Sequence, residues 1–302
     1  MKKIAISIGD INGIGPQIAL ISHDIIKKIC SPVYCVHEEI LKQACEILKI
    51  PMPKDVVFAE PDTRPVLIHP GCMEEKSGAY SYESFKMACD LADKKVVHGV
   101  CTLPINKGAW QLACVNAISH TDYLRQRYNK QAIMMLGCEK MFVALFTEHL
   151  ALKEVSQKIQ KTALVDFMIN FACCSKAKKA LVLGLNPHCG DNGAMGDEEK
   201  IIQIAIAQAN KTLKKNIFDG PVAADTAFSP ENRRKYLFFI GMYHDVALAP
   251  LKALYFYESI NVTLNIPILR TSVDHGTAYD KAYRTNPNTQ SYCNAVEKIA
   301  LS

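Results

Sequence analysis

Short apolar runs alternate along the chain with longer segments in which apolar residues recur every three or four positions. Short apolar runs are typical of buried strands, and the longer pattern is typical of helices that cover a sheet. Prolines are frequent between residues 51 and 70, so this stretch is expected to be rich in loops. The expected strands cover residues 3–8, 33–36, 96–102, 132–136, 141–146, 180–185, 236–242 and 260–264. The expected helices cover residues 16–29, 38–48, 81–94, 155–171, 198–214 and a segment near 250–257.

Alternating strands and helices predict an α/β protein whose mostly parallel sheet is covered on both faces. The 302 residues suit about two domains, at roughly 150 residues each. A chain of this length buries a large core without a structural metal, so any metal is expected to serve catalysis. In such sheets ligands bind beyond the carboxyl ends of the strands, and the polar motifs of this chain fall at those positions.

Charge and cysteine content narrow the class of protein further. The net charge is +5, but the lysines are scattered without a basic block and interleaved aromatics, so no nucleic-acid partner is expected. No apolar run approaches the ~20 residues of a membrane span, so no membrane partner is expected. The 12 cysteines include no C-x-x-C pair, and the first residues lack a secretory pattern. We therefore expect reduced thiols and a cytoplasmic protein.

Three histidines follow predicted strands: His149, His188 and His244. Imidazoles at the carboxyl edge of a sheet point toward the expected ligand site. Three of them could hold one ion such as Zn²⁺ and leave a coordination position open for substrate. Because they are far apart in the sequence, the alternative of three unrelated polar loop residues also stays open.

Two segments are candidates for binding a nucleotide. The sequence GDINGIGP at residues 9–16 joins a strand to a helix. Its Gly13 and Gly15 either let backbone amides approach an anion or simply permit a tight turn. In the sequence SVDHGTA at residues 272–278, Gly276 and Thr277 could seat a nucleotide before a helix, with Asp280 near a ribose or adenine. A plain capped helix start is the alternative there.

Basic and polar residues near two late strands could bind an anionic substrate. Lys252 and Arg270 could hold phosphate and carboxylate groups, and Arg suits a bidentate clamp. Arg270 follows the apolar residues 266–269 and is therefore expected to end a buried strand, whereas surface charge is the alternative. His120 and Thr121 precede a helical stretch, where they could combine an N-cap with a substrate donor.

Together these segments resemble the 4-hydroxythreonine-4-phosphate dehydrogenase family of vitamin B6 biosynthesis. The matching blocks span nearly the whole chain in the family's order. They are GD at 9–10 with GIGP at 13–16, TLPINK at 102–107, SHT at 119–121, TEHL at 147–150, GLNPH at 184–188, GDEE at 196–199, GP at 220–221 with ADT at 224–226, YHD at 243–245, INVTL at 260–264 and RTSVDHGTA at 270–278.

The resemblance implies an isocitrate/isopropylmalate-dehydrogenase-like fold. This fold has two α/β/α domains around a mostly parallel sheet, with the active site in the cleft between them. Residues 1–125 with 270–302 would form the cofactor-side domain, and residues 126–269 the metal-binding and dimerisation domain. The resemblance also implies a homodimer whose active site is shared across the interface.

The same resemblance implies one divalent metal ion per active site, Zn²⁺, Mg²⁺ or Co²⁺. Two of its ligands would be His149 and His188 of one subunit. The third would be His244 of the partner subunit. The implied substrate is a small phosphorylated hydroxy amino acid. Its expected contacts are His120, Thr121, Lys252, Asn261 and Arg270. The implied oxidant is NAD or NADP. Its expected contacts are Gly13, Gly15, Asn186, His275, Gly276, Thr277 and Asp280.

The implied reaction oxidises 4-phosphohydroxy-L-threonine to 2-amino-3-oxo-4-phosphooxybutanoate. Decarboxylation then gives 3-amino-2-oxopropyl phosphate for pyridoxine 5′-phosphate biosynthesis. A metal ion would lower the pKa of the substrate hydroxyl and then stabilise the enolate that forms as CO₂ leaves. Asp245 and Lys252 are our candidates for proton transfer.

Departures from the family pattern leave alternatives open. Ile11 and Asn12 stand where the family usually has Pro-Ala, and Val246 and Ala247 replace a usual Gln-Gly. An alternative function is the oxidation of four-carbon sugar-acid phosphates such as threonate or erythronate 4-phosphate. A zinc hydrolase is disfavoured because no H-E-x-x-H motif is present. A catalytically silent binding protein is disfavoured by the intact histidine set.

Overall fold

The computed structural model describes residues Met1–Ser302. The chain forms two compact units. The first unit comprises Met1–Lys130, Ile260–Val262 and Ile266–Ser302, and the second comprises Gln131–Ser259 and Thr263–Asn265. None of the helices combines the length and the apolar character that crossing a bilayer requires.

The first unit is built on parallel strands in the order β3-β2-β1-β4-β11. The β1 strand is central, and all its residues after Lys3 are buried, as expected for a parallel strand covered on both faces. The strands are β1 (Lys3–Ser7), β2 (Ser31–Cys35), β3 (Val57–Phe58), β4 (Gly99–Thr102) and β11 (Arg270–Val273).

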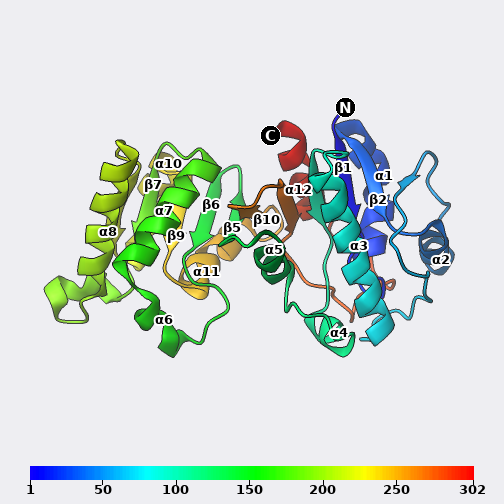
Figure 1. Cartoon of the computed structure of the whole chain (residues 1–302), viewed down its shortest axis with the longest axis horizontal. Coiled ribbons are helices and arrows are strands. Elements are labelled where there is room, and N and C mark those ends of the chain that lie inside the picture. Colours follow the sequence, from blue (N-terminus) through cyan, green and yellow to red (C-terminus); the bar gives the residue numbers. More distant parts are fainter. The chain divides into compact units, whose positions relative to one another are not determined.

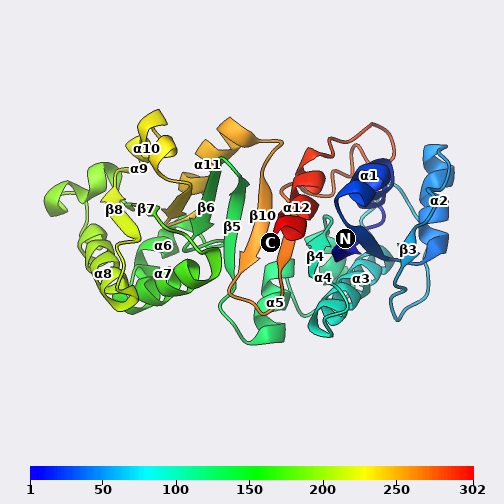
Figure 2. The same cartoon turned by 90° about the horizontal axis from the view of Figure 1, so that it is seen from above.

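Helices cover both faces of these strands. The helices are α1 (Gly15–Ile29), α2 (Glu38–Leu48), α3 (Glu75–Asp93), α4 (Lys107–Leu112), α5 (His120–Tyr128) and α12 (Gln290–Leu301). Figure 2 shows α3 and α4 on one face and α1 and α12 on the other. Local sequence explains several helix starts: Pro16 occupies the first turn of α1. Asn106 and Ser119 cap α4 and α5, since each side chain accepts a backbone N–H.

The core between α3 and the first-unit strands is rich in aromatic residues. Phe85 and Trp110 are both fully buried there. Trp110 is the single tryptophan of the chain, and its indole N–H donates to the Ser81 hydroxyl at 2.8 Å. The buried indole is therefore satisfied, as expected of a tryptophan in a core.

The second unit has strands in the order β5-β6-β9-β7-β8. Only β5 and β6 pair antiparallel, whereas β6–β9, β9–β7 and β7–β8 pair parallel. The strands are β5 (Ile133–Cys138), β6 (Met141–Leu145), β7 (Ala180–Leu183), β8 (Phe218–Val222) and β9 (Phe238–Gly241). A further strand, β10 (Ile260–Leu264), is divided between the two units.

The second unit also has helices on both faces of its strands (Figures 1 and 2). They are α6 (Leu152–Lys158), α7 (Lys161–Ser175), the 3₁₀ segment η1 (Pro187–Gly193), α8 (Glu198–Leu213), α9 (Ala224–Ala227), α10 (Pro230–Lys235) and α11 (His244–Tyr255). The α7 and α8 helices lie on one face and α11 on the other. Ala247, Leu248 and Leu251 of α11 pack into a core with apolar residues of β5, β6, β7 and β9.

The α/β class and the mostly parallel sheet predicted from the sequence are confirmed. Several predicted elements differ in detail. The helix expected at 155–171 is two helices, because residues 159–160 break it. The helix expected near 250–257 begins earlier, at His244. Arg270 does not end a strand but begins β11, since the residues before it, including Pro267, form a bend and make no ladder.

Candidate active site

His149 and His244 lie side by side in the second unit. His149 follows β6 and His244 opens α11 directly after β9, and these two strands are parallel neighbours. The centroids of the two imidazole rings are 6.2 Å apart, with an interplanar angle of 36°. Nδ1 of His244 lies 2.7 Å from Oδ1 of Asp245. A carboxylate on one ring nitrogen leaves the other nitrogen to a ligand, as in many metal-binding histidines.

The chemistry of this pair suits a divalent metal ion. Imidazole nitrogens are common ligands of Zn²⁺, and both rings can be reached from solvent, because His149 is exposed and the His244 side chain is 40% exposed. Within the chain, no group of three or more histidine, cysteine or acidic side chains is arranged to hold a metal ion. The structure thus brings together two of the three predicted ligands, and the three-histidine site stays a prediction.

His188 lies on a loop with an unusual backbone. Six consecutive residues have positive φ angles, from His188 at 52° to Gly193 at 99°. Gly190 and Gly193 are the only glycines among them. For other residues the left-handed conformation costs roughly 1–2 kcal/mol each. Such a backbone persists only where surrounding contacts hold it in place.

Glu199 supplies contacts of this kind. Its carboxylate is buried in the first turn of α8. Oε1 accepts the backbone N–H of Leu185 at 2.9 Å and that of Asn186 at 2.6 Å. The Asn186 side-chain amide donates to Glu199 at 2.9 Å and to Glu198 at 2.8 Å. Asn186 was assigned to the cofactor from the sequence, and here its amide nitrogen binds two carboxylates of the chain itself.

Lys252 lies on α11, in the same unit as the histidine pair. Its Nζ is 3.4 Å from the Ser259 hydroxyl and 5.2 Å from the ring centroid of Phe256. A flexible ammonium group in this setting is able to bind a phosphate oxygen as a point charge. Its roles in substrate binding and proton transfer stay predictions.

Arg270 is the most deeply buried cation assigned to the substrate. The residue is 1% exposed, and Nη2 donates to the Thr102 hydroxyl at 2.6 Å. Burial lowers the pKa of the guanidinium to about 10, so the group stays charged at neutral pH. A buried, fork-shaped cation of this kind suits a phosphate or carboxylate group.

His120 lies near Arg270 in the first unit. Burial, followed by the positive charge of Arg270, holds the pKa of His120 well below its usual value, so the imidazole is neutral. The rings of Phe85 and Trp110 lie 4.6 and 5.7 Å from the His120 ring, between centroids. Nε2 of His120 is buried and has no hydrogen-bond partner. Thr121, the next residue of α5, is buried beside it.

Asn261 carries a second buried polar atom without a partner. Its Oδ1 accepts no hydrogen bond, and Asn261 belongs to the first unit, as His120 does. Buried polar atoms are rarely left unsatisfied unless a ligand or water serves them. Both orphaned atoms belong to residues that the sequence assigns to substrate binding.

The two segments predicted to bind the cofactor meet in the first unit. A Cβ atom placed on Gly13 would lie 2.9 Å from Cβ of Thr277, and one on Gly15 would lie 2.4 Å from the carbonyl oxygen of Ile8. These two glycines therefore let the chain pack closely on itself, which favours the tight-turn alternative. Gly276 differs, because it is exposed and a Cβ there would meet nothing within 4 Å.

The helix expected directly after residue 278 is not found there. Residues 279–284 form turns, and α12 begins only at Gln290. Asp280 is exposed within these turns. Nδ1 of His275 donates to the carbonyl oxygen of Gly276 at 3.1 Å. The cofactor roles of His275, Gly276 and Asp280 stay predictions, without the helix N-terminus that was expected to support them.

Asn12, one of the departures from the family pattern, fixes the loop at residues 69–74. Its Oδ1 accepts the backbone N–H of His69 at 2.8 Å. Its Nδ2 donates to the carbonyl oxygen of Cys72 at 2.9 Å and to Oε2 of Glu74 at 3.2 Å. An alanine at this position would make none of these bonds, so the departure has a structural role in this chain.

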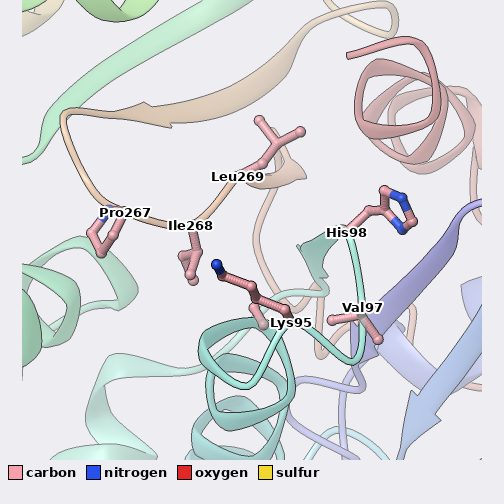
Figure 3. A pocket seen from close by; sticks show the side chains of 7 residues that line it. Lys95, Val97, His98, Pro267, Ile268 and Leu269 are labelled. Carbon is pink, nitrogen blue, oxygen red and sulfur yellow. The ribbon is translucent and has the colours of Figure 1, made fainter.

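A pocket of about 320 Å³ lies in the first unit, away from the strand ends that carry the motifs. Figure 3 shows residues 267–269 on one side and Lys95, Val97 and His98 on the other. These residues precede β11 and β4, so the pocket is at the amino ends of both strands. No residue assigned to substrate, cofactor or metal lines it.

Comparisons with known proteins agree with the sequence blocks. A family model described as "Pyridoxal phosphate biosynthetic protein PdxA" matches residues 28–299. The chain belongs to this family. Relatives named 4-hydroxythreonine-4-phosphate dehydrogenase include one from Sulfurimonas denitrificans, 49% identical over 300 residues, covering 99% of this chain and 97% of the relative. One from Helicobacter pylori is 50% identical over 304 residues and covers 99% of both chains.

A solved structure gives the same result for the fold. The crystal structure of 4-hydroxythreonine-4-phosphate dehydrogenase from Klebsiella pneumoniae superposes with a TM-score of 0.82. The sequences are 27% identical, and the match covers 100% of this chain and 99% of that one. The PdxA family predicted from the sequence is confirmed, and membership in it supports an oxidoreductase that serves pyridoxal phosphate biosynthesis.

Proposed function

We propose that this protein oxidises 4-phosphohydroxy-L-threonine with NAD or NADP as oxidant and one divalent metal ion per site. The product, 2-amino-3-oxo-4-phosphooxybutanoate, then loses CO₂ to give 3-amino-2-oxopropyl phosphate. The chain-long similarity to relatives named for this substrate supports the proposal. The observation that carries its metal-dependent chemistry is that His149 and His244 both reach the surface where the neighbouring strands β6 and β9 end, with Asp245 on Nδ1 of His244.

The metal ligands in this proposal are His149 and His188 of one subunit and His244 of the partner subunit. The bound ion would polarise the substrate hydroxyl as a Lewis acid, and the nicotinamide would accept the hydride. The contact between Asp245 and Nδ1 of His244 fixes one tautomer and directs Nε2 to its ligand. Asp245 thus orients a ligand in this proposal, in addition to its earlier candidacy for proton transfer.

The substrate-binding residues act through charge and shape. Arg270 would hold a phosphate or carboxylate oxygen pair with its guanidinium, already charged and buried before the substrate binds. Neutral His120 would exchange a hydrogen bond with a substrate oxygen through Nε2. Asn261 would accept a donor, such as the substrate ammonium group, at Oδ1. Lys252 would neutralise a further negative charge and relay a proton.

Turnover assays test this proposal. NADH formation is measured with 4-phosphohydroxy-L-threonine, threonate 4-phosphate and erythronate 4-phosphate as substrates. We expect the first to give the highest kcat/KM, chelation to abolish turnover, and Zn²⁺, Co²⁺ or Mg²⁺ to restore it. A higher kcat/KM with either sugar-acid phosphate would make the substrate assignment wrong. Full activity in a verified metal-free preparation would exclude the metal.

Matched histidine variants test the pair itself. His149→Ala and His244→Ala should each lose nearly all turnover, because each removes a ligand. His98→Ala is the control, since His98 is exposed in the pocket of the first unit and takes no part in the proposal. Equal losses in all three variants would mean that the effect is not specific to the pair.

We also propose a homodimer whose subunits share each active site, as the family resemblance implies. Light scattering gives the oligomeric state. Mixed His149→Ala and His244→Ala protomers should recover toward about a quarter of wild-type activity, by the two-fold symmetry of such an interface. No recovery despite demonstrated subunit exchange would mean that His149 and His244 of one chain serve the same ion, as the distance between their rings allows.

A further inference from the structure

We propose that Glu199 is a positioning residue for His188: its buried carboxylate holds the loop that presents this histidine to the metal ion. The inference rests on the proposed function, because His188 is a metal ligand only within that proposal. Glu199 belongs to the GDEE block at 196–199, for which the sequence indicated no role.

The contacts of Glu199 lie immediately before His188 in the chain. Both backbone N–H groups of Leu185 and Asn186 point at Oε1. The side-chain amide of Asn186 binds Oε2. One carboxylate therefore fixes the path of the chain from the end of β7 to Pro187, the residue that precedes the histidine.

The loop also approaches the same carboxylate after His188, at Gly190. Gly190 has a φ of +74°, and a Cβ atom there would lie 2.7 Å from Oε2 of Glu199. His188 thus lies between two segments that both rest on Glu199. Since His188 and its neighbours have positive φ angles, the loop depends on these outside contacts to keep its conformation.

A carboxylate suits this position better than any neutral side chain of the same size. All three groups that bind Glu199 are N–H donors, and an ionised carboxylate offers acceptors only. A glutamine would keep one acceptor oxygen but direct its own NH₂ at an N–H donor. An aspartate would keep the charge, but its carboxylate would be withdrawn by one methylene group.

The measurement is the affinity of the purified, full-length protein for Zn²⁺, by competition with a chromophoric chelator, together with the visible spectrum of the Co²⁺ form. We expect Glu199→Gln and Glu199→Asp to raise the Kd for Zn²⁺ by about 10- to 100-fold, as loss of an orienting partner does at other metal sites. The Co²⁺ spectrum should change as well, because it reports the ligand set directly.

The control is Asp197→Asn. It makes the same carboxylate-to-amide change two positions away, on an exposed side chain that forms an ion pair with Lys200, at 2.6 Å. Its Kd should equal that of the wild type. If Glu199→Gln is not recovered as folded protein, Gly190→Ala takes its place, since it pushes on the same carboxylate from the loop side. In a Glu199→Asp background Gly190→Ala should then raise the Kd by less than it does alone.

The outcomes separate the inference from the proposed function. If the wild type binds none of Zn²⁺, Co²⁺ and Mg²⁺ stoichiometrically, the proposed function fails. If the wild type binds Zn²⁺ and His188→Ala weakens binding, the metal site stands. In that case an unchanged Kd and Co²⁺ spectrum in the Glu199 variants would overturn the positioning role alone.

Discussion

Arg127 links α5, the helix that begins with His120 and Thr121, to α3. Its guanidinium binds Asp90 at 2.5 Å and Asp93 at 2.6 Å, both on α3. Nη1 donates to the hydroxyl of Tyr123 at 2.8 Å. Replacing Arg127 with alanine would remove these bonds together and leave two aspartates close to each other. We expect the first unit to lose stability and α5 to lose its anchor on α3.

The expected loss of stability in Arg127→Ala depends on how exposed the side chains of Arg127, Asp90 and Asp93 are. A hydrogen bond to a charged group contributes roughly 1.5–3 kcal/mol when buried, and an exposed ion pair contributes at most about 1 kcal/mol. The side chain of Arg127 is 21% exposed, and those of Asp90 and Asp93 are 36% and 33% exposed. The network therefore lies between the two limits. We expect Arg127→Ala to lower the free energy of unfolding by about 2–3 kcal/mol in total.

The assay is equilibrium unfolding in urea, followed by tryptophan fluorescence. Trp110 is the single tryptophan and is fully buried in the first unit, so its signal reports the unit that contains the network. The control is Lys42→Ala, also in the first unit, whose ion pair with Glu38 is 56% and 51% exposed and should contribute much less to stability. An unfolding midpoint for Arg127→Ala no lower than that of the control would refute the reasoning.

Other expected outcomes concern the site. The pKa of His120 is lowered from 6.5 by burial and then by the charge of Arg270. Below pH 6.5 the unfolded chain therefore binds a proton that the folded protein does not bind, and stability is lost as the pH falls. His120→Asn should remove this part of the loss, up to about 1.4 kcal/mol per pH unit; urea midpoints of both proteins that fall in parallel with pH would contradict this. Arg270→Ala and Lys252→Ala should each lower kcat/KM on the order of a hundredfold, which corresponds to a few kcal/mol of lost transition-state binding. Wild-type values of kcat/KM in both variants would show that the anion-binding residues are assigned wrongly. Zn²⁺ should raise the melting temperature of the wild type but not of His149→Ala, since an ion stabilises only the state that binds it; equal shifts in calorimetry would argue against His149 as a ligand.

The sequence predicted best those elements whose pattern reflects burial on both faces. The β6 strand is a continuous apolar run and β10 is apolar or β-branched except at Asn261, and both were found within a residue of their bounds. The β8 strand was missed because its sequence FDGPV contains Gly and Pro, which are typical of turns. The β11 strand begins with Arg270, and its burial depends on neighbours that the local sequence does not show.

The site was predictable only in part, for a related reason. Parallel order places residues that follow neighbouring strands at one edge of a sheet, so the contact of His149 and His244 follows from the strand pattern once β6 and β9 are known to be adjacent. Strand adjacency itself is not local information. The positioning role proposed for Glu199 depends on a left-handed backbone at residues 188–192. Apart from the glycine at 190, the side chains of these residues do not predict such a backbone.

Because the side chain of Asn12 is hydrogen-bonded to segment 69–74, we expect the residue at position 12 and this segment to be inherited together. Grafting the family's usual Pro-Ala pair into this chain would leave the N–H of His69 and the carbonyl of Cys72 without their present partner. If a relative's segment replaced residues 69–74 while Asn12 was kept, the side chain of Asn12 would in turn be left without its present partners. A working chimera has to exchange both pieces at once. Across relatives, the two stretches should therefore change together, although nearly sixty positions separate Asn12 from His69.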